Sequence, residues 1–235
     1  MCIKSRIIIK SEYNYLRVID VIVNDKEVKR LLEEVKPAKL VAATKYVDEK
    51  EIEKLEELGC LVYGENRVQA FLEKYDKYKG KGQWHFIGTL QSNKVKYIID
   101  KVELIHSINT LKLIKEVEKQ ASKIDKQIHV LLEVNIADEE SKQGFNKDDI
   151  NEAMDLIVNC PHIIVEGLMM MAPNIEIEKT RQYFRKTKEL LLQLQVKYPQ
   201  YPLNELSMGM SNDYKIALEE GATMVRIGRA LFKDE

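Results

Sequence analysis

Two cations beside short apolar segments are the residues of this sequence best suited to chemistry. Lys45 follows the apolar run Leu40–Thr44, and Arg226 lies inside a second run, Met224–Gly228. Two cations in one half-buried site are costly unless an anion binds between them or the lysine loses its proton. Because a neutral lysine amine attacks carbonyl groups, this pair predicts a nucleophilic lysine beside a bound anion.

Donors for a phosphate group occur in the same part of the chain as Arg226. The segment Ser207–Ser211 begins and ends with a hydroxyl group, and Gly228 and Arg229 follow Arg226 directly. Serine hydroxyls and glycine N–H groups suit phosphate oxygens. A lysine near a phosphate site predicts an aldehyde phosphate that is held as a Schiff base.

Each of these residues also has a plainer interpretation. Lys45 precedes a helix cap, a place where most lysines are solvated. Arg226 has the alternative of a structural ion pair. Ser207 and Ser211 are also suited to capping the helix that follows them, and Asn66 is equally suited to an N-cap. The residue types alone leave these alternatives open.

The elements that must position these side chains alternate between apolar strands and amphipathic helices. Eight strands are expected, at Leu40–Thr44, Leu61–Gly64, Trp84–Gly88, Glu103–Ile108, Ile128–Asn135, Ile163–Ala172, Glu205–Gly209 and Met224–Gly228. Helices are expected at Asp48–Leu58, Thr110–Ala121, Ile177–Lys197 and Asn212–Glu220.

This alternation predicts an α/β fold, and eight units favour a single (β/α)8 barrel of the TIM type over an open sheet. Chemistry in such barrels lies at the carboxyl ends of the strands. The first and last strands are neighbours in a closed barrel, so Lys45 and Arg226 are expected to meet at its mouth. We expect one domain over residues 1–235, in which residues 1–36 form an N-terminal extension and a helix near Val28–Val35.

Composition excludes several classes of function. The 37 basic and 38 acidic residues nearly cancel, which disfavours a nucleic-acid or membrane partner. Three cysteines without a paired spacing fit a reducing cytoplasm. The four histidines, at positions 85, 106, 129 and 162, show no metal-binding spacing. We interpret His106, His129 and His162 as packed or surface residues. The role of His85, which lies in an expected strand beside Trp84, is left open.

A series of ordered motifs resembles the pyridoxal phosphate homeostasis protein family, also called the YggS or proline-synthetase co-transcribed family. The resemblance runs from about Leu40 to Phe232. The motifs are Leu40–Lys45, Gly64–Asn66, Trp84–Lys94, His106–Ser107, Glu139–Phe145, Gly167–Met169, Leu206–Ser211 and Met224–Gly228.

The resemblance implies a barrel similar to the N-terminal domain of alanine racemase, with pyridoxal 5′-phosphate (PLP) as cofactor. It implies a Schiff base on Lys45 as the reactive residue and Arg226 facing the pyridine nitrogen. It also implies further cofactor-binding residues, namely Asn66, His85, Ser207, Ser211, Gly228 and Arg229. Arg229 departs from the family pattern, in which this position often carries a small hydroxyl residue.

The family resemblance implies a role in intracellular PLP (vitamin B6) homeostasis, with PLP-dependent apoenzymes as recipients and no robust catalysis. A racemase acting on amino acids is the alternative. Arginine weakens the electron sink of PLP because it cannot take up a proton from the ring nitrogen. Racemisation also needs a second base, which alanine racemases take from a separate domain that we do not expect here.

The sequence also suggests an alternative function, a second ligand site and an oligomeric state. A phosphate-sugar barrel enzyme that uses Lys45 without PLP is a third reading, against which the ordered motifs argue. Lys142 is a candidate for a second, looser PLP site. We expect a cytoplasmic monomer or weak dimer.

Overall fold

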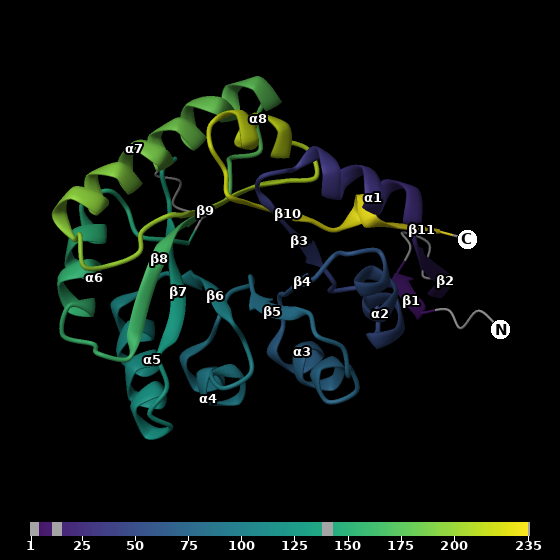
Figure 1. Cartoon of the computed structure of the whole chain (residues 1–235), viewed down its shortest axis with the longest axis horizontal. Helices are drawn as coiled ribbons and strands as arrows, with labels where there is room; N and C mark the ends of the chain where they lie inside the picture. Colours follow the sequence, from purple (N-terminus) through teal and green to yellow (C-terminus); the bar gives the residue numbers. More distant parts are fainter. Residues whose placement is uncertain (1–4, 11–15, 138–142, 235) are drawn as a thin grey trace.

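A closed barrel of eight parallel strands forms the centre of the molecule (Figure 1). The computed structural model describes residues 5–10, 16–137 and 143–234. The strand order is β10-β3-β4-β5-β6-β7-β8-β9, which confirms the predicted barrel. The strands are β3 (Lys39–Ala43), β4 (Val62–Glu65), β5 (Gln83–Phe86), β6 (Leu104–Ile108), β7 (Ile128–Val134), β8 (Ile163–Met170), β9 (Glu205–Met210) and β10 (Met224–Ile227).

Helices surround the barrel on its outside (Figure 1). They are α1 (Asp25–Glu34), α2 (Glu49–Glu57), α3 (Val68–Tyr75), α4 (Val95–Ile98), α5 (Leu111–Lys123), α6 (Asp149–Ile157), α7 (Arg181–Lys197) and α8 (Tyr214–Glu219). Short 3-10 turns are η1 (Ser92–Lys94), η2 (Ile177–Thr180) and η3 (Arg229–Leu231). In the described part of the chain, no helix combines the length and apolar character needed to cross a membrane.

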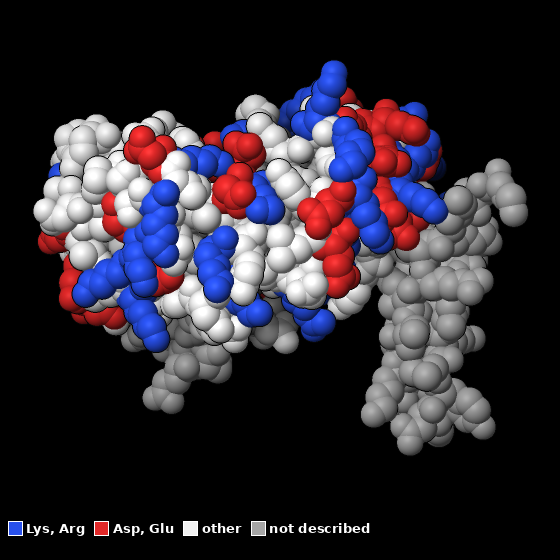
Figure 2. Space-filling view, turned by 90° about the horizontal axis from the view of Figure 1, so that it is seen from below, with Lys and Arg blue, Asp and Glu red and all other residues white. Residues whose placement is uncertain are grey.

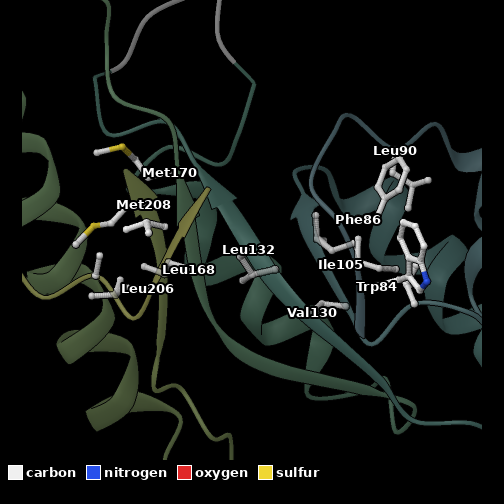
Figure 3. Close-up of a cluster of buried hydrophobic side chains, with 14 of the residues drawn as sticks. Trp84, Phe86, Leu90, Ile105, Val130, Leu132, Leu168, Met170, Leu206 and Met208 are labelled. Atoms are coloured by element: carbon white, nitrogen blue, oxygen red, sulfur yellow. The ribbon is translucent and has the colours of Figure 1, made fainter. Parts of the chain in front are cut away.

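Side chains alternate along each strand, which gives the barrel two hydrophobic layers. The inner layer fills the barrel and is centred on Val41, Leu104, Leu131, Met169 and Met224. The outer layer packs the strands against the helices, and Figure 3 shows part of it on β5 to β9. The barrel is therefore a packed core that opens only at its ends.

Helix α2 shows how local sequence sets the elements. Asp48 is the N-cap, and its side chain and that of Glu51 form the expected capping box. Gly59 follows the helix with φ +91°, a conformation that glycine adopts without strain. The predicted start and end of this helix are both confirmed.

The N-terminal extension differs from expectation. Residues 3–23 have no clear period in the sequence, yet β1 (Ser5–Lys10) and β2 (Leu16–Val23) form an antiparallel pair there. Strand β11 (Phe232–Asp234) pairs with β2, so both ends of the chain share a three-stranded sheet outside the barrel. The helix expected near Val28–Val35 is α1, which starts three residues earlier.

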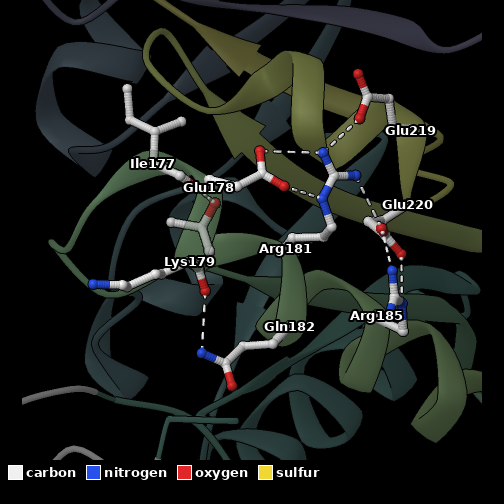
Figure 4. Close-up of polar contacts among 9 residues, drawn as sticks. Ile177, Glu178, Lys179, Arg181, Gln182, Arg185, Glu219 and Glu220 are labelled. Atoms are coloured by element: carbon white, nitrogen blue, oxygen red, sulfur yellow. Dashed lines mark hydrogen bonds and ion pairs between the residues drawn. The ribbon is translucent and has the colours of Figure 1, made fainter.

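A network of ion pairs joins η2 and α7 to the end of α8 (Figure 4). Arg181 pairs with Glu178 at 2.5 Å, with Glu219 at 2.7 Å and with Glu220 at 3.1 Å. Arg185 adds a second contact to Glu220 at 2.9 Å. Because the residues are on the surface, we assign the network a role in holding these segments together rather than a large stability contribution.

The surface carries charges of both signs. Figure 2 shows Lys and Arg interspersed with Asp and Glu on one face of the molecule. This mixing accords with the formal net charge of −1.

The inner layer yields the first prediction. Leu131 is completely buried in the barrel, so Leu131→Ala should lower the free energy of unfolding by about 2–5 kcal/mol through lost contacts and a residual cavity. Denaturant titration measures this change. The matched control is Leu192→Ala on α7, where the side chain is 51% exposed and the expected change is within about 0.5 kcal/mol. Equal effects of the two substitutions would contradict the packed interior.

Candidate functional site

A cavity of about 460 Å³ opens at the carboxyl ends of the barrel strands. Its walls come from the ends of β3, β4, β5, β8, β9 and β10 and from the loops that follow them. Six of the eight residues proposed from the sequence line it, namely Lys45, Asn66, Ser211, Arg226, Gly228 and Arg229. The other two, His85 and Ser207, lie outside this lining.

Lys45 reaches the cavity from a tight turn after β3. The Thr44 N–H donates to the Gly64 carbonyl at 3.1 Å, and the Val47 N–H donates to the Thr44 carbonyl at 3.2 Å. Lys45 and Tyr46 are therefore the two central residues of a hydrogen-bonded turn. The Lys45 side chain is exposed, and its Nζ lies 4.6 Å from the centroid of the Tyr46 ring. Because this side chain is exposed and lines the cavity, its amine is accessible to a ligand there.

Arg226 lies at the floor of the cavity and is held by neutral oxygens. Its Nη1 donates to the Ser207 carbonyl at 2.7 Å and to the Ser207 hydroxyl at 2.6 Å. Its Nη2 donates to the Met170 carbonyl at 2.9 Å. These contacts differ from the structural ion pair that was the alternative interpretation of this residue.

Burial lowers the pKa of the Arg226 guanidinium to about 10, and the carboxylates of Asp213 and Glu133 oppose this effect. The group therefore stays charged at neutral pH. Because three acceptors fix its plane, Arg226 presents a rigid cation to the cavity.

A chain of hydrogen bonds runs from Arg226 into the barrel. The Ser207 Oγ lies 2.9 Å from the His106 Nδ1, and the His106 Nε2 lies 2.9 Å from the His85 Nδ1. Because arginine only donates, the Ser207 hydroxyl accepts from Arg226 and shares a second hydrogen bond with His106.

Both histidines in this chain are neutral. Burial lowers the pKa of His85 to about 3 and that of His106 well below its usual range. The Ser207 hydroxyl is completely buried and occupied by Arg226 and His106, so it supports the arginine from below. From the sequence, His106 was interpreted as a packed or surface histidine. Its place in the hydrogen-bonded series from Arg226 to His85 depends on which strands are neighbours, which the sequence does not show.

Three of the four phosphate donors expected from the sequence, Ser211, Gly228 and Arg229, line the cavity, whereas the fourth, Ser207, is buried outside its lining. Ser211 is half-buried, while Gly228 and Arg229 follow β10 beside it. The Asp213 carboxylate accepts from the Met210 N–H at 2.6 Å and thereby shapes the loop that carries Ser211. The N-cap of α8 is Asp213, so neither serine caps that helix.

Asn66 also belongs to the cavity rather than to a helix cap. Helix α3 has Arg67 as its N-cap, and Asn66 precedes it at the cavity wall. The backbone of Asn66 lies so close to Gly88 that a Cβ there would come within 2.3 Å of the Asn66 carbonyl oxygen. Glycine at 88 is therefore what allows this close approach.

Glu133 is a buried carboxylate near the mouth that the sequence reading missed. It lies on β7, is 4% exposed and accepts from the Asn109 amide at 3.2 Å. The same amide donates to Gln143 at 2.8 Å, which also contacts the Thr89 hydroxyl. Desolvation raises the pKa of Glu133, although the Asn109 hydrogen bond and Arg226 act in the opposite direction. A charged residue inside the apolar run Ile128–Val134 is a signal that could have identified Glu133, as it identified Arg226.

The remaining candidates lie away from the cavity or beyond the described chain. His129 pairs with Glu166 and His162 pairs with Glu118, each at 2.7 Å, in contacts outside the cavity. Lys142, proposed as a second PLP site, lies outside the described residues.

Comparison with known proteins gives consistent matches. The sequence model of the alanine racemase N-terminal domain family matches residues 24–235. A pyridoxal phosphate homeostasis protein of Aquifex aeolicus is 47% identical over 197 residues, which are 83% of this chain and 86% of that protein. The chain belongs to the pyridoxal phosphate homeostasis protein family. The resemblance seen in the ordered motifs is thereby confirmed.

Solved structures agree with this placement. A structure of PipY from Synechococcus elongatus PCC7942 without PLP matches with a TM-score of 0.85 and 29% identity, over 89% of this chain and 99% of that one. A second structure of PipY, with PLP bound, matches with a TM-score of 0.84 and 28% identity over the same shares.

The raised pKa of Glu133 leads to a pH-dependent prediction. Because the pKa of Glu133 is raised in the folded protein, the folded state binds this proton more tightly than the unfolded chain does, so the group lowers stability as pH rises above its ordinary pKa of 4.5. Glu133→Gln should therefore raise the free energy of unfolding at pH 7 and give no gain below about pH 4. Denaturant titrations at both pH values test this, with the exposed Glu103→Gln as control. A gain of equal size at both pH values would contradict the burial argument.

Proposed function

We propose that this protein binds PLP through a Schiff base on Lys45 and acts in the homeostasis of PLP inside the cell. One observation carries the proposal: an accessible lysine, a fixed arginine and a set of phosphate donors line a single cavity. Membership of the family and the PLP-bound structure of PipY support it.

The residues present fit PLP by charge, by chemistry and by size. The cofactor is an anionic aldehyde, and the cavity offers the cations Lys45, Arg226 and Arg229. Ile87 and Met171 supply apolar wall for a flat ring. A cavity of about 460 Å³ lies within the usual range of small-molecule sites. When bound, PLP supplies an electrophilic carbon, with which the Lys45 amine condenses with loss of one water.

Each residue receives a role from its position. Lys45 would form the covalent bond, and Arg226 would face the ring nitrogen. Ser211, Gly228 and Arg229 would hold the phosphate, with Arg229 adding a guanidinium to backbone and hydroxyl donors. Asn66 would contact the ring from the β4 side. In the proposed site, Ser207 and His85 act indirectly, through the hydrogen-bonded chain that fixes Arg226.

The state of Arg226 favours holding the cofactor over using it. With a pKa of about 10, Arg226 donates to the ring nitrogen and accepts no proton from it. An unprotonated ring nitrogen is a weaker electron sink. We therefore propose a carrier that delivers PLP to apoenzymes in the cytoplasm, where its free cysteines Cys60 and Cys160 remain reduced.

The covalent bond is tested by removing its amine. Lys45→Ala should abolish the visible absorbance of protein-bound PLP and the adduct that borohydride fixes, because Lys45 is the one lysine among the described residues that line the cavity. Absorbance spectra before and after borohydride measure this. Lys112→Ala, on the exposed side of α5, is the control and should retain both signals. A reducible adduct that persists in Lys45→Ala would contradict the assignment.

Removing the charge at the cavity floor should have a separate effect. Arg226→Gln should weaken PLP retention roughly 10–100-fold through loss of a charged hydrogen bond, while the Schiff base still forms. Dialysis followed by cofactor quantification measures retention, and circular dichroism verifies folding. Arg185→Gln in the outer ion network is the matched control. Full retention in Arg226→Gln would exclude a contact with the ring.

A further inference from the structure

A buried ion pair lies directly behind the turn that carries Lys45. Lys74 on α3 donates from its Nζ to the Glu65 carboxylate at 2.5 Å, and the side chains of the two residues are 10% and 0% exposed. The same Nζ donates to the Thr44 carbonyl at 2.6 Å. The Thr44 hydroxyl donates to the same Glu65 oxygen at 2.6 Å. The pair thus holds the residue that precedes Lys45 by both its backbone and its side chain.

This contact fixes the start of the Lys45 turn. The Thr44 carbonyl also accepts from the Val47 N–H. The same oxygen therefore closes the turn and accepts the hydrogen bond from Lys74. Lys45 and Tyr46 lie between these two points. A shift of the Thr44 carbonyl would therefore change the direction in which the Lys45 side chain leaves the strand.

We propose that Lys74, with Glu65, is a positioning residue that orients Lys45 for Schiff base formation with PLP; this inference rests on the proposed function. Neither Lys74 nor Glu65 is among the residues that line the cavity; Glu65 ends β4, Lys74 lies on α3, and the two side chains meet between these elements. Their effect on the ligand must pass through the Thr44–Val47 turn.

The free-energy cost of burying the Lys74 and Glu65 charges argues that this pair has a positioning role. A buried ion pair can often be replaced by apolar residues of similar volume without loss of stability. This pair is also incompletely satisfied, since the second carboxylate oxygen of Glu65 is buried with no hydrogen-bond partner in the described chain. Apolar residues would fill the same space, but they would not donate to the Thr44 carbonyl. The donor function is therefore what the charged pair adds.

The test must separate positioning from general damage. Lys74→Met alone leaves the Glu65 charge buried and unpaired, which endangers folding. The main variant is therefore Lys74→Met with Glu65→Met, which keeps the volume and removes both charges. Thr44→Val loses the contacts of the hydroxyl with Glu65 and with the Gly64 carbonyl, and it keeps the contact between Lys74 and the Thr44 carbonyl. Lys39→Met, which breaks an ion pair with Glu205 at the other end of β3, is the matched control.

Two ligands distinguish the possible effects. PLP has an aldehyde and can condense with Lys45, whereas pyridoxine 5′-phosphate has an alcohol there and binds without a covalent bond. Misplacement of a reacting group costs on the order of tenfold to a hundredfold. We expect the double variant to lose this factor in PLP affinity and in the rate of adduct formation. Its affinity for pyridoxine 5′-phosphate should change less than about threefold, as should PLP binding by Thr44→Val and Lys39→Met.

Three results would overturn the inference. One is a folded double variant that forms the adduct at the parent rate. Another is an equal loss of affinity for both ligands, which would show a collapsed pocket instead of a misdirected lysine. The third is a loss in Thr44→Val as large as that in the double variant. Failure of the parent protein to form any adduct would instead refute the proposed function, so the two failures are distinguishable. If the double variant does not fold, Lys74→Gln with Glu65→Gln decides, because it removes both charges, keeps polar groups at both positions and shortens the donor that reaches the Thr44 carbonyl. It should lose the same factor in adduct rate, and a parent-like rate would overturn the inference.

Discussion

The pairing of β10 with β3 is the contact on which the site depends, because it closes the barrel. Its register places Arg226 opposite Val41 and Ile227 opposite Ala42. The first strand therefore delivers Lys45 to the mouth beside a guanidinium from the last strand, although the two residues are far apart in the sequence. An open sheet with the same strands would leave β3 and β10 as separate edges.

Closure of the barrel also buries the charge of Arg226, and neutral hydrogen-bond acceptors offset the cost of that burial. A guanidinium buried inside a barrel needs acceptors, and Arg226 finds them in carbonyl and hydroxyl oxygens of β8 and β9. The two histidines extend this arrangement across the barrel without adding charge. On the outer side of the wall, the Lys74–Glu65 pair restrains the lysine turn from behind. The two cationic groups at the mouth are thus supported from different sides.

Much of the architecture follows from the sequence because it depends on local pattern. All eight barrel strands were predictable from short apolar runs, and α2 from its capping box and terminal glycine. The strands β1 and β2 were missed because their apolar runs lack a period of two, and their partner β11 lies at the other end of the chain. Helices α3, α4 and α6 were not assigned either, the first two being only eight and four residues long.

In the site too, features set by local sequence were predictable, and features set by contacts between distant elements were not. The sequence motifs, together with the rule that barrel sites lie at the carboxyl ends of the strands, predicted that Lys45, Arg226 and the residues around Gly228 lie at the mouth. They could not show that Ser207 faces Arg226 and His106 instead of the cavity, because that depends on which strand neighbours which. Glu133 and Lys74 were not proposed from the sequence. A lysine among other charged residues at the end of a helix has no distinctive local pattern, and the run around Glu133 does not show which groups on other elements this carboxylate meets.

A crystal structure of the protein with PLP is the most direct test of the central claim, that the two ends of the barrel sheet assemble one PLP site. We expect continuous density between the Lys45 Nζ and the cofactor, with Arg226 at the ring nitrogen and the phosphate against Ser211, Gly228 and Arg229. PLP bound at another lysine, or with its phosphate directed away from β9 and β10, would contradict it.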